Sequence, residues 1–169
     1  MKRIIKDGAI VEDAWETLTT PDVASAMFLA KSAMLLGKGV KAILPLAIYL
    51  AQVAALADSQ ASIGVLLGPN DDPDALVPYL KRLPLIAVNF PAFADGRGYS
   101  TGRLLRSRYG FAGELRAVGD VLRDQLYFLE RCGFNAFVLR DDQDLEAALT
   151  AFGDYAWQPA WQNHSRLPG

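Results

Sequence analysis

Short apolar segments alternate with segments of helical periodicity along most of this chain. Each apolar segment is followed by a turn and then by a stretch whose apolar residues recur every three or four positions. This alternation is typical of βα units, whose right-handed crossovers place successive strands parallel to one another. We predict an α/β fold with a mainly parallel sheet and about five βα units, whose strands lie at residues 40–46, 62–67, 85–90, 114–118 and 136–139.

The βα units fit two arrangements of the sheet. We favour an open sheet with helices on both faces, and a partial βα barrel is the alternative, because periodicity alone does not separate the two. The length of 169 residues is that of one domain, and no linker divides the chain. We therefore expect a single α/β domain over residues 1–169, with a hairpin region at 1–18, a first helix at 23–36 and a tail at 154–169.

Turn and capping residues predict where several elements begin. Asp7-Gly8 lies between apolar-rich arms and predicts a two-residue turn in an N-terminal β-hairpin. Asp72-Pro73 predicts a helix start, and Pro78 inside that helix should kink or shorten it. Asp120 is expected to cap the helix that follows the fourth strand.

Two residue counts exclude most metal and redox chemistry. The chain has one cysteine, Cys132, and one histidine, His164. A single cysteine builds no disulfide, cysteine-ligated zinc site or iron–sulfur cluster within the chain, and a single histidine near the end gives the body of the domain no Ser-His-Asp triad. We therefore predict no metal site and no cofactor, and we expect Cys132 to pack in the core.

Charge and hydropathy also limit the partners. The formal net charge of −2 favours neither nucleic acid nor an anionic membrane as a partner. No apolar stretch of signal-peptide length follows the charged start, and the longest apolar run is interrupted by Pro45 and is too short to cross a bilayer. We expect a soluble cytoplasmic protein.

The loop after residues 85–90 has features of an anion-binding site. Its glycines let backbone N–H groups approach a ligand, and a helix begins near Ser100. Arg97 and Arg103 carry planar guanidinium groups that suit carboxylate, sulfate or phosphate oxygens. The predicted anion-binding residues are Asp95, Gly96, Arg97, Gly98, Tyr99, Ser100, Arg103, Arg116, Asp120 and Arg123.

A purely structural interpretation stands beside this one. The loop glycines would then serve the turn, and Arg103 and Arg106 would lie on an exposed helix face. Asp120 and Asp124 are four positions apart, but a capping role and a pairing with an arginine explain them better than two catalytic carboxylates do.

Several segments resemble one bacterial family. Residues 95–100 (DGRGYS), 103–106 (RLLR), 113–126 (GELRAVGDVLRDQL) and 131–134 (RCGF) are similar to the family called domain of unknown function 934, as are residues 4–15 and 44–51. Members of that family are often labelled as oxidoreductases of sulfite reduction. The resemblance implies a setting in assimilatory sulfur metabolism, with a haemoprotein sulfite reductase as partner.

Two functions follow from these observations. The first is an accessory, non-redox protein that supports a sulfite reductase, because the chain lacks the residues that would hold a redox cofactor. The second is a small enzyme or binding protein for a sulfur oxyanion or a phosphorylated metabolite, in which Arg97, Arg103 and Arg116 hold the anion and Asp95 or Asp120 acts as acid or base. The sequence leaves open whether the chain is an enzyme, whether it forms a homo-oligomer, and whether the tail aromatics Tyr155, Trp157 and Trp161 contact a partner or their own sheet.

Overall fold

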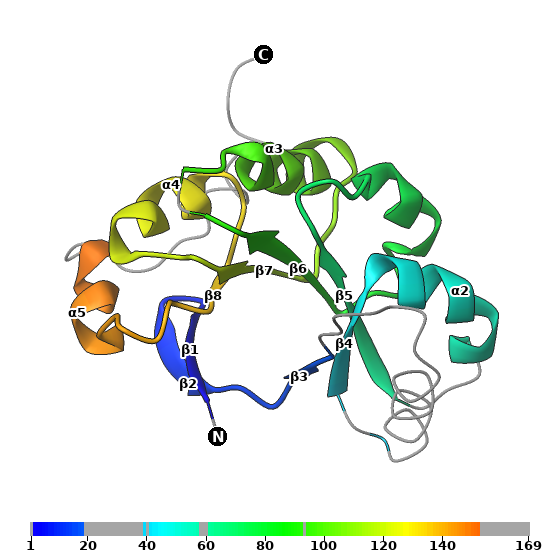
Figure 1. The fold of residues 1–169 in the computed structure, drawn as a ribbon, viewed down its shortest axis with the longest axis horizontal. Helices are drawn as coiled ribbons and strands as arrows, with labels where there is room; N and C mark the ends of the chain where they lie inside the picture. The colour runs from blue at the N-terminus through cyan, green and yellow to red at the C-terminus, as the bar shows by residue number, and fades with distance from the viewer. Residues whose placement is uncertain (1, 19–38, 40, 58–60, 93, 153–169) are drawn as a thin grey trace.

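A computed structural model describes residues 2–18, 39, 41–57, 61–92 and 94–152 (Figure 1). The helix expected at 23–36 and the tail at 154–169, with its aromatic residues and His164, lie outside the described residues.

One curved sheet of eight strands organises the fold. Its strands stand in the order β2-β1-β8-β7-β6-β5-β4-β3. Neighbours from β3 to β8 are parallel, whereas β1 pairs antiparallel with both β2 and β8. The strands are β1 (Arg3–Lys6), β2 (Ala9–Glu12), β3 (Glu16–Thr17), β4 (Lys41–Pro45), β5 (Ser62–Leu67), β6 (Leu85–Phe90), β7 (Glu114–Gly119) and β8 (Ala136–Phe137). The five predicted βα strands are β4 to β8, and the N-terminal hairpin is also confirmed.

The helical segments lie on the outer side of this curved sheet (Figure 1). They are α2 (Leu46–Leu56), η1 (Pro73–Tyr79), α3 (Arg97–Arg103), η2 (Leu104–Arg108), η3 (Arg123–Gln125), α4 (Leu126–Arg131), α5 (Leu145–Leu149) and η4 (Thr150–Phe152). Among the described residues, no helix has both the length and the apolar character that crossing a membrane requires.

The strand order decides between the two predicted arrangements. The parallel strands follow one another across the sheet in chain order, without a reversal. Right-handed crossovers that all step in one direction place every helix on the same face, and the sheet then curls into part of a barrel. The partial barrel is therefore the arrangement found. The open sheet with helices on both faces, which we favoured, is wrong, because it needs a point at which the strand order reverses.

Side chains alternate between two apolar layers. On β6, Ile86, Val88 and Phe90 point outward into the large core beneath the helices. Leu85 and Ala87 point inward and join Ile43 in a smaller cluster, against which Trp15, Leu66 and Val118 pack. The concave face of the sheet is therefore partly filled by its own side chains, as in a βα barrel.

Local sequence explains the ends of several elements. Asp7 and Gly8 have φ values of 50° and 77°, as a tight hairpin turn requires. The Asp72 side chain accepts a hydrogen bond from the Asp74 N–H, and η1 ends directly after Pro78, as predicted. The prediction for Asp120 is wrong. The next helical turn begins only at Arg123, where the Gln125 side chain accepts the Leu122 N–H.

Candidate functional site

The predicted loop residues Asp95 and Arg97 form a close ion pair. The Arg97 Nη2 atom lies 2.6 Å from Asp95 Oδ2, and Nε donates to Oδ1 at 3.0 Å. These bonds and the Arg97 backbone N–H lower the pKa of Asp95 to about 2. Arg97 Nη1 also donates to Asn70 Oδ1 at 2.7 Å. The guanidinium group of Arg97 therefore already has a carboxylate and an amide oxygen as partners.

Two glycines within α3 allow the helix to pack closely on the sheet. A Cβ atom on Gly98 would lie 2.5 Å from the ring of Phe90, and one on Gly102 would lie 2.3 Å from the ring of Phe134. A Cβ atom on Gly96 would meet nothing within 4 Å. Tyr99 packs edge-to-face on Phe90, with ring centroids 5.3 Å apart, and burial raises the pKa of its hydroxyl. Gly98 and Tyr99 thus fix α3 on the sheet, and Ser100 is exposed.

The two arginines after this loop have different environments. Arg103 is exposed, and its Nη2 lies 3.9 Å from the sulfur of buried Cys132, at the end of α4. The purely structural interpretation places Arg106 on the same exposed face, and this part of it is wrong. Arg106 is buried, and burial lowers the pKa of its guanidinium to about 10, so the group stays charged at neutral pH. It donates at 2.7 Å to the carbonyls of Phe111, Gly113 and Gly133, and at 3.0 Å to Asn135 Oδ1.

Arg116 points to the opposite, concave side of the sheet. Its side chain is only 2% exposed. Its Nε donates to Glu114 Oε1 at 2.8 Å, and its Nη1 donates to Asp13 Oδ2 at 2.9 Å. Lys6 Nζ lies 3.0 Å from the other Glu114 oxygen. Two cations and two carboxylates thus balance one another inside the half-barrel.

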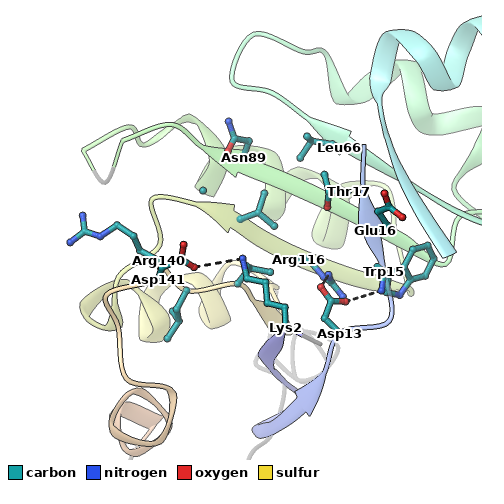
Figure 2. A pocket seen from close by; sticks show the side chains of 14 residues that line it. Lys2, Asp13, Trp15, Glu16, Thr17, Leu66, Asn89, Arg116, Arg140 and Asp141 are labelled. Carbon is teal, nitrogen blue, oxygen red and sulfur yellow. Dashed lines mark hydrogen bonds and ion pairs between the residues drawn. The ribbon is translucent and has the colours of Figure 1, made fainter. Parts of the chain in front are cut away.

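A cavity of about 630 Å³ opens above this network, at the carboxyl ends of the parallel strands (Figure 2). Leu66 of β5, Asn89 of β6 and Val118 of β7 line one side. Another side is lined by Asp13 and Trp15, which lie between β2 and β3, and by Glu16 and Thr17 of β3. Loops at this edge of a parallel sheet form the ligand sites of βα barrels and of open α/β sheets.

Ion pairs surround the mouth of the cavity. Arg140 Nη1 donates to Asp120 Oδ1 at 3.0 Å, and Arg140 Nε donates to Asp142 Oδ1 at 2.7 Å. These two carboxylates raise the pKa of Arg140 above its ordinary value, with Asp142 the larger influence. Lys2 Nζ lies 4.0 Å from Asp141 Oδ1, and both side chains are exposed.

The structure therefore distributes the predicted anion-binding residues over two sides of the sheet. Arg116 lines the concave cavity, and Asp120 pairs with Arg140 at its mouth. Arg97 and Arg103 belong to α3, which lies on the outer side (Figure 1), and exposed Arg123 belongs to η3. No common cleft brings these arginines together in the described part of the chain. No group of three or more His, Cys, Asp or Glu residues that could hold a metal ion occurs there either.

Sequence reasoning did not find the cavity residues Asn89, Trp15 and Lys2. Asn89 follows Leu85 and Ala87 at alternate positions of β6, so it is the polar end of an otherwise apolar inward row. Asn89 could have been identified from the sequence as a polar residue at the carboxyl end of a row of inward-facing apolar residues.

A pair of aromatic residues is exposed on the outer side of the molecule. The relative exposures of Tyr127 and Phe128, on α4, are 51% and 62%. Their rings meet edge-to-face with centroids 5.6 Å apart. The Arg131 guanidinium lies 5.4 Å from the centre of the Tyr127 ring and donates to the Tyr127 hydroxyl at 2.9 Å. We call Arg103, Tyr127, Phe128 and Arg131 the α4 patch.

The chain matches a known protein family. The family described as bacterial protein of unknown function, DUF934, matches residues 64–167. The chain belongs to this family. The resemblance noted from residues 95–134 is thereby confirmed, whereas none of the curated proteins matches the chain.

The DUF934 match includes only part of the cavity. It covers Asn89, Arg116 and Arg140, together with all of α3 and α4. Asp13 and Trp15, which complete the cavity, come from the N-terminal segment outside the match. In this DUF934 chain, two distant parts of the sequence thus build the concave site.

Proposed function

We propose that this DUF934 chain is an accessory protein of assimilatory sulfite reduction that docks onto the haemoprotein sulfite reductase and carries no electrons itself. The sulfur setting comes from the family resemblance. The non-redox role is supported by the sequence, which contains one cysteine and one histidine and so has few residues that ligate haem iron or an iron–sulfur cluster.

The α4 patch is the observation that carries this proposal. Burial of an exposed aromatic ring lowers the free energy, and tyrosine, phenylalanine and arginine are enriched in the cores of protein interfaces. Phe128 is 62% exposed and stands next to Tyr127 on the same helix. A partner that covers both rings would gain the burial of apolar surface.

The arginines of the patch indicate the charge of that partner. Arg131 lies against Tyr127, and Arg103 reaches the end of α4 through its contact with the Cys132 sulfur. Just before α4, exposed Arg123 stands beside exposed Asp124, so the positive charge of the patch comes from Arg103 and Arg131. Guanidinium groups around an aromatic centre favour a partner surface that carries carboxylates. We therefore expect an acidic, partly apolar face on the reductase.

Binding between the purified chain and a purified sulfite reductase haemoprotein tests the proposal. Phe128→Asp removes the most exposed ring and adds a charge that repels an acidic partner. Loss of a central aromatic contact costs about 2 kcal/mol, so we expect binding at least about 30-fold weaker, measured by biolayer interferometry.

Val77→Asp is the matched control, because Val77 is 44% exposed on η1, away from the patch. It should leave the dissociation constant unchanged. A docking role would be refuted by the absence of any complex at micromolar concentrations, or by equal weakening in both variants. Sulfite reduction that proceeds at the normal rate in cells without the chain would also contradict it.

A further inference from the structure

We propose that the cavity at the carboxyl ends of β5, β6 and β7 binds a small, uncharged, flat metabolite that carries an amide-type group. This site lies on the concave side of the sheet (Figure 2), whereas helix α4, which carries Tyr127 and Phe128, lies on the outer side (Figure 1). The inference is therefore independent of the docking function.

The position and size of the cavity are those of a ligand site. Parallel βα sheets bind ligands beyond the carboxyl ends of their strands, where loops can vary without disturbing the core. The volume of about 630 Å³ lies within the range of about 300–1,000 Å³ that is typical of small-molecule pockets. Asp13, Trp15 and Arg116 also line a second, smaller cavity of about 240 Å³, so the network around Arg116 forms the floor between the two.

One amide side chain in the cavity lacks a hydrogen-bond partner within the part of the chain that the structure describes. Among the described residues, none forms a hydrogen bond with the carboxamide of Asn89, which lines the cavity beside Gly119. A carboxamide offers a donor and an acceptor side by side. Its best complement is another amide-type edge, with an acceptor and a donor at the same spacing. The ligand is therefore expected to present such an edge to Asn89.

The charges around the cavity are balanced, which indicates an uncharged ligand. Arg116, the cation at the floor, is held by Asp13 and Glu114. At the mouth, Arg140 is held by Asp120 and Asp142. A carboxylate or sulfur oxyanion would have to approach these acidic groups, and its loss of hydration would not be repaid. Each Nη of Arg116 keeps a further N–H for a neutral carbonyl oxygen, because three guanidinium contacts use only part of its donors.

The walls indicate a flat, partly apolar ligand. Trp15 contributes an indole ring, and Leu66 and Val118 contribute aliphatic surface. Lys41 Nζ lies 5.8 Å from the centre of the indole ring, and a planar ligand can stack on the other face of this ring. A flat ring with one amide edge satisfies both kinds of surface.

A titration followed by protein NMR tests this assignment, with benzamide and uracil as uncharged amide-bearing probes. Benzoate has the ring of benzamide with a carboxylate instead of the amide, and sulfite represents the sulfur oxyanions. Probes of this size bind with dissociation constants of about 1 mM when they fit. We expect benzamide or uracil to shift the backbone signals of Gly119 and Val138 at millimolar concentration. Benzoate and sulfite should bind at least about fivefold more weakly.

Variants of Asn89 connect the signal to the cavity. Asn89→Asp keeps the shape of the side chain but removes the N–H donor and adds a negative charge. Asn89→Ala removes both polar atoms. Each should weaken the binding of the neutral probe about fivefold or more, which corresponds to one lost hydrogen bond. Phe128→Ala, in the α4 patch, should leave probe binding unchanged.

Three results would overturn the proposal. One is that neither neutral probe shifts the cavity signals at about 10 mM, a concentration well above the expected dissociation constant. Another is tighter binding of benzoate or sulfite, which would make the cavity an anion site. The third is unchanged affinity in both Asn89 variants, provided that their spectra show a folded chain.

Discussion

Replacement of Arg106 by methionine should destabilise the fold by about 4 kcal/mol. Methionine fills much of the same space but donates no hydrogen bond. Asn135 Oδ1 keeps the Leu115 N–H as a donor at 2.8 Å. The three carbonyl oxygens bonded by Arg106 at 2.7 Å lose a charged donor. A buried acceptor left without a donor costs roughly 1–2 kcal/mol, and the sum over the three gives the expected loss.

Urea denaturation followed by circular dichroism measures this loss. With an m value of about 2 kcal/mol/M, the midpoint should fall by about 2 M. Arg108→Met is the matched control, because Arg108 is exposed on the same η2 turn, and it should change stability by less than about 0.5 kcal/mol. Arg106→Lys keeps the charge but not the planar fork, so it should recover only part of the loss. A loss below about 1 kcal/mol for Arg106→Met would refute a structural role for these bonds.

Two further predictions concern α3 and the loop before it. Gly98→Ala should destabilise the chain by about 1–3 kcal/mol, because the added methyl group meets the Phe90 ring at 2.5 Å. A Cβ atom on Gly96 meets open space, so Gly96→Ala should change stability by less than about 0.5 kcal/mol in the same urea denaturation. Equal losses of stability in both variants would contradict the packing argument. The folded-state pKa of Asp95 is lowered to about 2 by Arg97. The stabilising pair is therefore present above the ordinary carboxyl pKa and is lost as the pH falls through about 2. Carboxyl-carbon NMR of Asp95 should show a titration midpoint at this pH. Arg97→Ala should return the midpoint to the ordinary range of an aspartate. An unchanged midpoint in this variant would show that the ion pair with Arg97 does not lower the pKa of Asp95.

Elements that depend on local sequence were predictable. The strand over Leu85–Phe90 was predicted with the bounds that the structure shows, because an apolar run between turn residues has few other ways to be buried. Asp7-Gly8 specified its hairpin because both positions require a positive φ. Asp120 failed as a cap because a tertiary contact, with Arg140 beyond β8, takes its carboxylate.

The arrangement of the sheet depends on the order in which the strands lie side by side, and the periodicity of apolar residues does not specify this order. A βα unit has the same pattern of apolar residues whether the next strand is added on one side of the sheet or on the other. Strand β3, with only Glu16 and Thr17, is too short to give a pattern at all. Its pairing with β4 comes from tertiary structure.

In the candidate sites, too, the sequence predicted the type of residue but not its tertiary contacts. Arginine was a sound indicator of polar contacts, but sequence does not say which partner a guanidinium finds. Arg97 finds a carboxylate two residues away, Arg106 finds backbone carbonyls, and Arg116 finds Asp13 from the far end of the chain. The exposure of Phe128 was equally hidden, because helical periodicity does not show which of two neighbouring aromatic residues a tertiary contact will cover.

The pairing of β1 with β8 has a consequence for how the chain folds during translation. Asp7 and Asn135 are hydrogen-bonded although they are 128 positions apart. The hairpin leaves the ribosome early, and the strand that will lie beside it is synthesised only after most of the other βα units. Until then, one edge of β1 has no neighbour and can pair with another nascent chain. Pairing of β1 with β8 is thus a late, long-range step of folding. Until it occurs, aggregation through the open edge of β1 competes with correct folding.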